Sequence, residues 1–370
     1  MTRPFGPQPA PDSGPRLGPA PAPGPMDTAL TRLAGCRYPV VQTGMGWVAG
    51  PRLVAAACEA GALGILASAT LGREETAAAI RAVKRRTDAP FGVNLRADAA
   101  DARERAEMLV AEGVRVASFA LAPQQDLIDL LKDGGVAVVP TVGAPRHAEK
   151  VASWGADAVM VQGSEGGGHT GPVSTTVLLP RVLDAVDIPV VAAGGFRDGR
   201  GLAAALAFGA SGIGMGTRFL LTSDSTVPDA VKRAYLEAED TVVTRAVDGL
   251  PHRVLSTPAI EALERAGGLR RLLLALRNAR AFRTEAGAGW APLLREGWAM
   301  RRSTGAGLGR TLMAANTPMM LKAAMVEGRT DAGVMSAGQT VGAITDLPSC
   351  RDLVHRTVRE ARETVAGLPG

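Results

Sequence analysis

Residues 189–216 read PVVAAGGFRDGRGLAAALAFGASGIGMG, and this stretch decides the fold. It begins and ends with a short apolar run, 189–193 and 211–216, of the kind that forms parallel strands buried on both faces of a sheet. Between the runs lies a segment with helical spacing, and Gly209 stands where a helix ends in a left-handed residue. The stretch therefore predicts a strand, a helix and a second strand.

The same unit recurs towards the N-terminus. Six further apolar runs precede the stretch: residues 38–42, 63–67, 91–95, 114–120, 136–141 and 158–162. Helix-like segments with a charged outer face lie between them, such as 51–60, 74–86 and 124–132, and glycines recur at helix ends as Gly61, Gly113, Gly135 and Gly155. Eight units in about 180 residues predict an α/β fold, a TIM (β/α)8 barrel. A doubly wound sheet is the alternative, but eight repeats without a long crossover favour closure.

Composition and length limit the other possibilities. The chain has 370 residues, 46% of them hydrophobic and 21% charged, and lacks an apolar run of eighteen, which excludes a membrane span, a coiled coil and a wholly disordered chain. It is longer than the roughly 250 residues of one barrel. We therefore expect four parts: a disordered Pro- and Gly-rich leader (1–26), the barrel (27–225), an Arg-rich helical substrate or lid domain after the last strand (226–334), and a C-terminal segment packing back on the barrel (335–370).

Cysteine is scarce. Cys36, Cys58 and Cys350 stand far apart, and neither a CxxC motif nor clustered histidines complete a metal site, so we expect no metal. This usage of cysteine fits a reducing compartment, and we expect a cytoplasmic protein.

The ends of the first and third strands carry ligand-binding signals. Chemistry in a barrel belongs at the C-terminal ends of the strands. The first run ends in Thr43-Gly44-Met45-Gly46, where glycines let the backbone approach a flat ligand and the thioether can pack on it. An ordinary turn is the alternative. The third run ends at Asn94, whose amide can bond the edge of a ligand ring.

The sixth strand ends in the most unusual loop. Gln162 is followed by GSEGGGHTG, residues 163–171, with five glycines in nine positions. Such a loop costs chain entropy and adds no packing, so it indicates backbone pressed against a ligand, with Gly167 and Gly168 leading to His169. A surface histidine is the alternative, but the glycines and the strand end favour a catalytic base.

Two glycine turns follow the seventh and eighth strands, Gly194-Gly195 and Met215-Gly216-Thr217. Loops at these positions are the usual phosphate site of a barrel, because bare amides meet the anion there. A phosphate here, with a ring reaching towards the first, third and sixth strands, suits FMN. The chain has neither a Walker loop nor a GxGxxG unit with an acidic ribose residue, so a nucleoside triphosphate or a dinucleotide is less expected.

In combination these motifs resemble the nitronate monooxygenase (2-nitropropane dioxygenase) superfamily, which also contains the flavin-dependent enoyl-acyl-carrier-protein reductase II. The resemblance rests on Gln42 to Gly46, Gly92 to Asn94, Glu165 to His169, Ala193 to Gly195, Met215 to Arg218 and Ala337 to Gln339. It implies His169 as the base and FMN contacts at Met45, Asn94, Gln162, Gly194, Gly195, Met215, Gly216 and Thr217. The superfamily also suggests a homodimer.

Longer stretches are most similar to an actinobacterial branch that acts on the C and D rings of steroids: residues 39–50, 91–94, 96–101, 166–172 and 313–318. This branch dehydrogenates a hydroxylated methyl-oxo-octahydroindene-carboxyl-CoA with a flavin. Where monooxygenases usually carry Gln-Ala-Pro-Met, this chain has Gln42-Thr43-Gly44-Met45, which argues against nitronate oxidation. The resemblance thus implies α,β-dehydrogenation of a steroid-derived acyl-CoA. Nitronate oxidation and NAD(P)H-dependent enoyl-thioester reduction are the alternatives, and the His169 loop disfavours a binding module without turnover.

The net charge of +5 is concentrated in one segment. Residues 265–310 carry ten Arg against two Glu, a local balance of +8, so the other residues sum to −3. Arginines on the expected helices 261–283 and 290–302 suit the phosphates of CoA, and we expect contacts from Arg277, Arg280, Arg283, Arg301 and Arg302. A solvated basic face is the alternative. Nucleic acid is not expected, because no binding motif appears.

Overall fold

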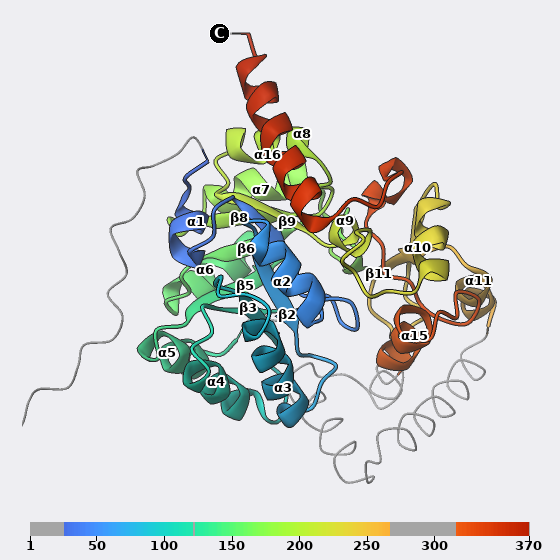
Figure 1. The fold of residues 1–370 in the computed structure, drawn as a ribbon, viewed down its shortest axis with the longest axis horizontal. Coiled ribbons are helices and arrows are strands. Elements are labelled where there is room, and N and C mark those ends of the chain that lie inside the picture. The colour runs from blue at the N-terminus through green and yellow to red at the C-terminus, as the bar shows by residue number, and fades with distance from the viewer. Residues whose placement is uncertain (1–25, 121–122, 267–315, 370) are drawn as a thin grey trace, which may run out of the picture.

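The fold is organised around a closed barrel. The computed structural model describes residues 26–120, 123–266 and 316–369. Eight parallel strands form a ring in the order β1, β2, β3, β4, β5, β6, β8 and β9, and β9 pairs with β1 (Figure 1). The predicted TIM barrel is confirmed and the doubly wound sheet is excluded. The strands are β1 Val40–Gln42, β2 Leu63–Ala67, β3 Gly92–Leu95, β4 Val116–Phe119, β5 Ala137–Val142, β6 Val159–Gln162, β8 Val190–Ala193 and β9 Gly212–Met215.

Seven helices alternate with these strands on the outside of the barrel (Figure 1). They are α2 Pro51–Glu59, α3 Arg73–Lys84, α4 Ala102–Ala111, α5 Gln125–Asp133, α6 Pro145–Ser153, α7 Thr175–Leu183 and α8 Gly199–Ala207. The glycines expected at helix ends all have a left-handed φ between +59° and +100°: Gly61, Gly113, Gly135, Gly155 and Gly209. For α2, α4, α5, α6 and α8 the sequence signal for the end of the helix is therefore local and correct, whereas α3 and α7 end without such a glycine.

Helix α1, Ala29–Ala34, covers the N-terminal end of the barrel. Its Leu30 and Ala34 belong to the apolar cluster that fills the barrel interior, together with Val41 and Met160. The Thr28 hydroxyl before the helix donates to the carbonyl oxygen of Ser211, 2.6 Å away, just ahead of β9. Met26, the last residue of the expected leader, is buried in the core. With this end covered, the C-terminal end of the barrel is the one that can hold a ligand.

The eighth helix of the barrel comes from much later in the chain. Helix α16, Cys350–Ala366, packs against both α8 and α2 and buries Leu353, Val354 and Val358. The contact with α8 is close, because a Cβ on Gly199 would come within 2.4 Å of the backbone nitrogen of Ala361. Residues 217–349 are thus inserted between the last strand and the last helix of the barrel.

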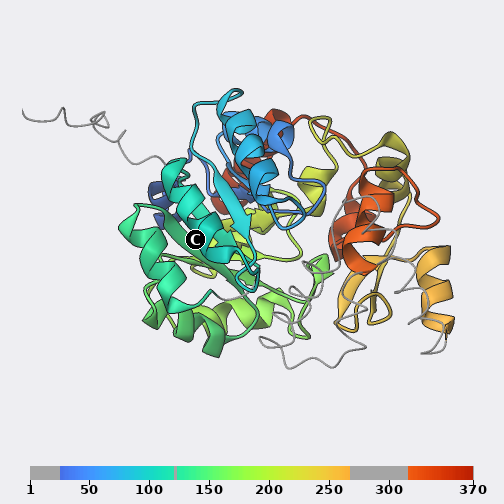
Figure 2. The same cartoon turned by 90° about the horizontal axis from the view of Figure 1, so that it is seen from below.

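The described part of this insertion lies on one side of the barrel (Figures 1 and 2). Its helices are α9 Thr217–Leu220, α10 Asp229–Leu236, α11 Pro258–Arg265, α15 Asn316–Met325 and the short 3-10 helix Gln339–Ala343. It also holds strands β10 Thr241–Thr244 and β11 His252–Leu255, which form an antiparallel sheet with β7, Gly168–His169. The region expected to be helical therefore carries a sheet as well, and β7 reaches it from the loop after β6.

Some expectations fall on residues that the structure does not describe. These are the leader up to residue 25, most of the expected helices 261–283 and 290–302, and Arg277, Arg280, Arg283, Arg301 and Arg302. In the described ranges, no helix is both long and apolar enough to cross a membrane.

Candidate functional site

The residues that the sequence singled out gather at the C-terminal ends of the barrel strands. The turn after β1 contacts the ends of β9 and β3: the Thr43 amide donates to the carbonyl oxygen of Met215 at 3.2 Å, and a Cβ on Gly44 would lie 2.6 Å from the Cβ of Asn94. A Cβ on Gly216 would lie 3.4 Å from the sulfur of Met45. Strands β1, β3 and β9 therefore end in one closely packed surface.

A buried polar atom in this surface has no partner among the described residues. Gln42 at the end of β1 is fully buried, and its Nε2 donates to the carbonyl oxygen of Thr43 at 2.5 Å. Its Oε1 accepts no hydrogen bond from the described chain. A buried acceptor without a donor is costly. A ligand ring that presents an N–H group, as a flavin does, fits this atom.

The glycine turns after β8 and β9 adopt different conformations. Gly194 and Gly195 have φ of +92° and +85°, a backbone that favours glycine. Gly216 precedes α9, and the Thr217 hydroxyl accepts a hydrogen bond from the Gly338 amide at 2.9 Å. The two turns lie on neighbouring strands, because β8 pairs with β9. Their glycine backbones form one edge beside the turn after β1.

The loop after β6 is pressed mainly against other parts of the chain. A Cβ on Gly163 would lie 2.1 Å from the Thr175 hydroxyl, and one on Gly167 would lie 2.6 Å from the carbonyl carbon of Ala337. Gln162 donates from Nε2 to the carbonyl oxygen of His169 at 2.8 Å. These glycines are needed for internal packing, which differs from the expectation that a ligand alone accounts for them. Only Gly168 and Gly171 of the loop's glycines have open space, as far as the described residues show.

His169 lies on β7 directly opposite His252 of β11, and their ring centroids are 4.7 Å apart. The Nε2 atom of His169 is 2.6 Å from Oδ2 of Asp248, whose side chain is 5% exposed, whereas that of His169 is 53% exposed. On the far side, Nε2 of His252 is 2.8 Å from the Ser336 hydroxyl. One ring of the cluster thus faces outward while its partners are buried.

Asp248 and His252 differ in charge near pH 7. Burial alone would raise the pKa of Asp248, but contacts with the ring nitrogens of His169 and His252 outweigh it and hold that pKa far below its usual range. Burial lowers the pKa of His252, and its contact with Asp248 only partly offsets this. Asp248 is therefore an anion and His252 a neutral ring near pH 7.

The cluster could also be considered as a metal site, since ligand atoms of His169, Asp248 and His252 lie within 4.8 Å of one another. Donor atoms about 2.1 Å from a tetrahedral zinc ion lie about 3.4 Å apart. The 2.6 Å between His169 and Asp248 is instead the length of a hydrogen bond. We interpret the cluster as a hydrogen-bonded group.

Sequence reasoning missed the partners of His169. Asp248 and His252 stand in a region expected to be helical, and only Asp248-Gly249, just before the run that contains His252, hints at a turn before a strand. It also missed Arg253, whose Nε donates to the Ser164 carbonyl oxygen and whose Nη1 donates to the Thr241 hydroxyl, both at 2.9 Å. Arg253 thereby ties the loop after β6 to the inserted sheet.

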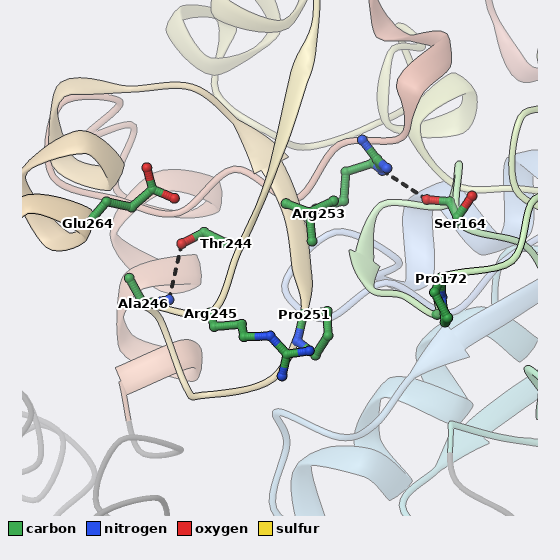
Figure 3. Close-up of a pocket in the computed structure, with 10 residues that line it drawn as sticks. Ser164, Pro172, Thr244, Arg245, Ala246, Pro251, Arg253 and Glu264 are labelled. Atoms are coloured by element: carbon green, nitrogen blue, oxygen red, sulfur yellow. Dashed lines mark hydrogen bonds between the residues drawn. The ribbon is translucent and has the colours of Figure 1, made fainter.

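A cleft of about 790 Å³ opens beside the His169 strand, between the loop after β6 and the inserted sheet (Figure 3). Arg253 points across it towards Ser164, and Arg245 lies on its rim (Figure 3). The Thr170 amide next to His169 donates to the carbonyl oxygen of Pro251, which lines the cleft. The other lining residues are Gly171, Pro172, Val243, Thr244, Ala246 and Glu264.

The buried neutral His252 predicts a pH dependence of stability. The pKa of His252 is lowered in the folded chain, so below the ordinary histidine value of about 6.5 the unfolded chain binds more protons than the folded one. The free energy of unfolding therefore falls as the pH is lowered through this range. We expect the thermal midpoint to drop between about pH 7 and 5, and the drop to be smaller in His252→Gln. Exposed His355→Gln is the matched control. Equal slopes in all three proteins would contradict a neutral His252.

Comparisons with known proteins show which family the chain is similar to. The family model described as nitronate monooxygenase matches residues 27–360. The chain is 61% identical to "(3aS,4S,5R,7aS)-5-hydroxy-7a-methyl-1-oxo-octahydro-1H-indene-4-carboxyl-CoA dehydrogenase" of Rhodococcus jostii, covering 93% of this chain and 98% of that one. A Mycobacterium tuberculosis protein of the same name is 61% identical, covering 91% and 96%. Among solved structures, FabK from Thermotoga maritima is 33% identical with a TM-score of 0.75, covering 92% and 97%.

Proposed function

The chain belongs to the nitronate monooxygenase family of flavin-dependent oxidoreductases, and from this premise we propose that it dehydrogenates a bicyclic acyl-CoA thioester with FMN as cofactor. The proposal is carried by the 61% identity, over 93% of the chain, to an enzyme named for dehydrogenating a hydroxy-methyl-oxo-octahydroindene-carboxyl-CoA. That fused ring pair has the skeleton of the C and D rings of a steroid. The substrate is thus an acyl-CoA from steroid breakdown, which loses hydrogens from its α and β carbons.

The proposed FMN site is the surface at the C-terminal ends of the strands. The unpartnered Oε1 of buried Gln42 and the glycine edges of β8 and β9 suit a flat ring with a phosphate. FMN, when bound, supplies a hydride acceptor for the β-hydrogen. The Nε2 atom of Gln162 already donates to the carbonyl oxygen of His169, so the side-chain oxygen of Gln162 is the atom left to contact the cofactor. The residues proposed to hold FMN are Thr43, Gly44, Met45, Asn94, Gln162, Gly167, Gly168, Gly194, Gly195, Met215, Gly216 and Thr217.

His169 is the proposed base. A thioester acidifies its α-hydrogen, and an imidazole is matched to removing that proton near neutral pH. The half-exposed ring can reach a bound substrate, and the charge that it gains is balanced by the buried carboxylate of Asp248. The same base would serve nitronate oxidation, which the family model keeps as the second candidate.

Anaerobic mixing of the holoenzyme with single substrates tests the proposal. The probes are the hydroxy-methyl-oxo-octahydroindene-carboxyl-CoA thioester, an alkyl nitronate and NADH, and the flavin absorbance band is followed. We expect the thioester to bleach the band on the time scale of a single turnover, and the α,β-unsaturated thioester to form.

The other probes supply the contrast. Bleaching by NADH with no response to the saturated thioester would overturn the proposal in favour of enoyl-thioester reduction. Turnover of the nitronate without any response to the thioester would establish the second candidate.

A further inference from the structure

The buried Asp248 is held in one orientation. Its Oδ1 accepts a hydrogen bond from the Leu250 amide at 3.0 Å, which closes the turn that leads into β11. Its Oδ2 faces Nε2 of His169 at 2.6 Å and Nδ1 of His252 at 3.9 Å. The carboxylate therefore sits between two imidazoles, in a turn whose backbone it also fixes.

The contact decides which nitrogen of His169 carries a proton. An ionised carboxylate only accepts hydrogen bonds, so at 2.6 Å the Nε2 of His169 must be the donor. A neutral imidazole has one N–H group, which leaves the lone pair on Nδ1. Nδ1 is thus the atom of His169 that can take a proton from a substrate.

The remaining surroundings keep this arrangement in place. The titratable side chains in contact with His169 among the described residues are Asp248 and His252. His252 is held by the Ser336 hydroxyl, and Ser336 forms an antiparallel bridge to Val254 of β11. The turn, β11 and Ser336 all belong to the inserted residues 217–349, whereas His169 follows a barrel strand.

We propose that Asp248 is the positioning residue of this enzyme, which holds His169 as the Nε2–H tautomer and so directs Nδ1 to the α-proton of the substrate. The inference deepens the proposed function and rests on His169 being its base. It assigns the inserted sheet a role in catalysis, because pairing of β7 with β11 brings the base next to a carboxylate 79 residues later in the chain. On proton transfer Nδ1 gains the proton, Nε2 keeps its own, and the imidazolium faces the carboxylate.

Asp248→Asn tests this inference. The amide keeps the shape of the carboxylate but can donate to Nε2, which then becomes the acceptor and leaves the proton on Nδ1. We expect kcat to fall by roughly 10²-fold or more with KM little changed. Asp331→Asn, an exposed acid on the same insertion, is the matched control and should match the wild type.

A direct measurement covers the case in which Asp248→Asn does not fold. The chain has four histidines, so ¹⁵N-histidine spectra of the holoenzyme can be assigned by the signal lost in His169→Ala. The Nε2–H tautomer of His169 is expected, and an Nδ1–H tautomer would overturn the inference. So would a wild-type kcat in a folded Asp248→Asn. Full turnover in His169→Ala would remove the proposed base and the role of Asp248 with it, whereas an inactive His169→Ala beside a fully active Asp248→Asn would overturn this inference alone.

Discussion

Replacing His169 by alanine is expected to leave a yellow, folded protein that turns over about 10²–10⁴-fold more slowly, the usual contribution of a general base. The side chain is half-exposed, is hydrogen-bonded to Asp248 and lies against the ring of His252, which is tilted by 47° to it. None of the turns after β1, β8 or β9 depends on it in the described structure. The variant therefore removes the base and leaves the proposed cofactor surface intact.

The measurement is kcat with the acyl-CoA thioester, with flavin content taken from the ratio of visible to ultraviolet absorbance. His147→Ala, an exposed histidine on α6, is the control and should behave as the wild type. Full turnover by His169→Ala would remove His169 from the mechanism. Loss of flavin in that variant would instead mean that the ring helps to hold the cofactor.

Gly44→Ala is expected to weaken FMN binding at least tenfold and to lower stability by about 1–3 kcal/mol, the cost of overpacking a filled site. The added Cβ would lie 2.6 Å from the Cβ of Asn94 and 3.3 Å from the Cγ2 of Ile65. Asn94 is buried at the end of β3 and Ile65 is buried in β2, so neither can retreat. The end of β3 must shift, and the side-chain amide of Asn94, which is proposed to contact the FMN ring, must shift with it.

Titration of the apoprotein with FMN, followed by quenching of flavin fluorescence, measures this effect, and thermal melting measures the stability. Gly143→Ala is the matched control, because Gly143 also follows a barrel strand and a Cβ there would meet nothing within 4 Å among the described residues. Wild-type FMN affinity in Gly44→Ala would show that this turn is not part of the cofactor site.

The barrel could be predicted because its signals are local. Each strand is a short apolar run, and five of the seven helices α2 to α8 are followed within a few residues by a left-handed glycine. The inserted sheet could not, since β7 has only two residues and pairs with a strand more than eighty positions away. Helix α16 shows the same limit: an amphipathic segment does not say which two helices it will lie between.

The site divides in the same way. His169 could be found because three glycines stand directly before it. Asp248 could not, because its importance arises only when the turn before β11 brings it to His169, 79 residues apart in the chain. The loop glycines were interpreted as a ligand signal, and at Gly163 and Gly167 close packing against Thr175 and Ala337 also requires a residue without a side chain.

The late position of α16 separates the order of synthesis from the order of assembly. A ribosome completes all eight barrel strands by residue 215, yet it must make more than 130 further residues before α16 emerges. Until then the faces of α8 and α2 that α16 covers, including Gly199, remain open to water and to other nascent chains. A chain cut short at residue 349 would keep every described strand and still lack one of the eight helices around the barrel, so its packing on α8 and α2 can form only after residues 350–366 have been made.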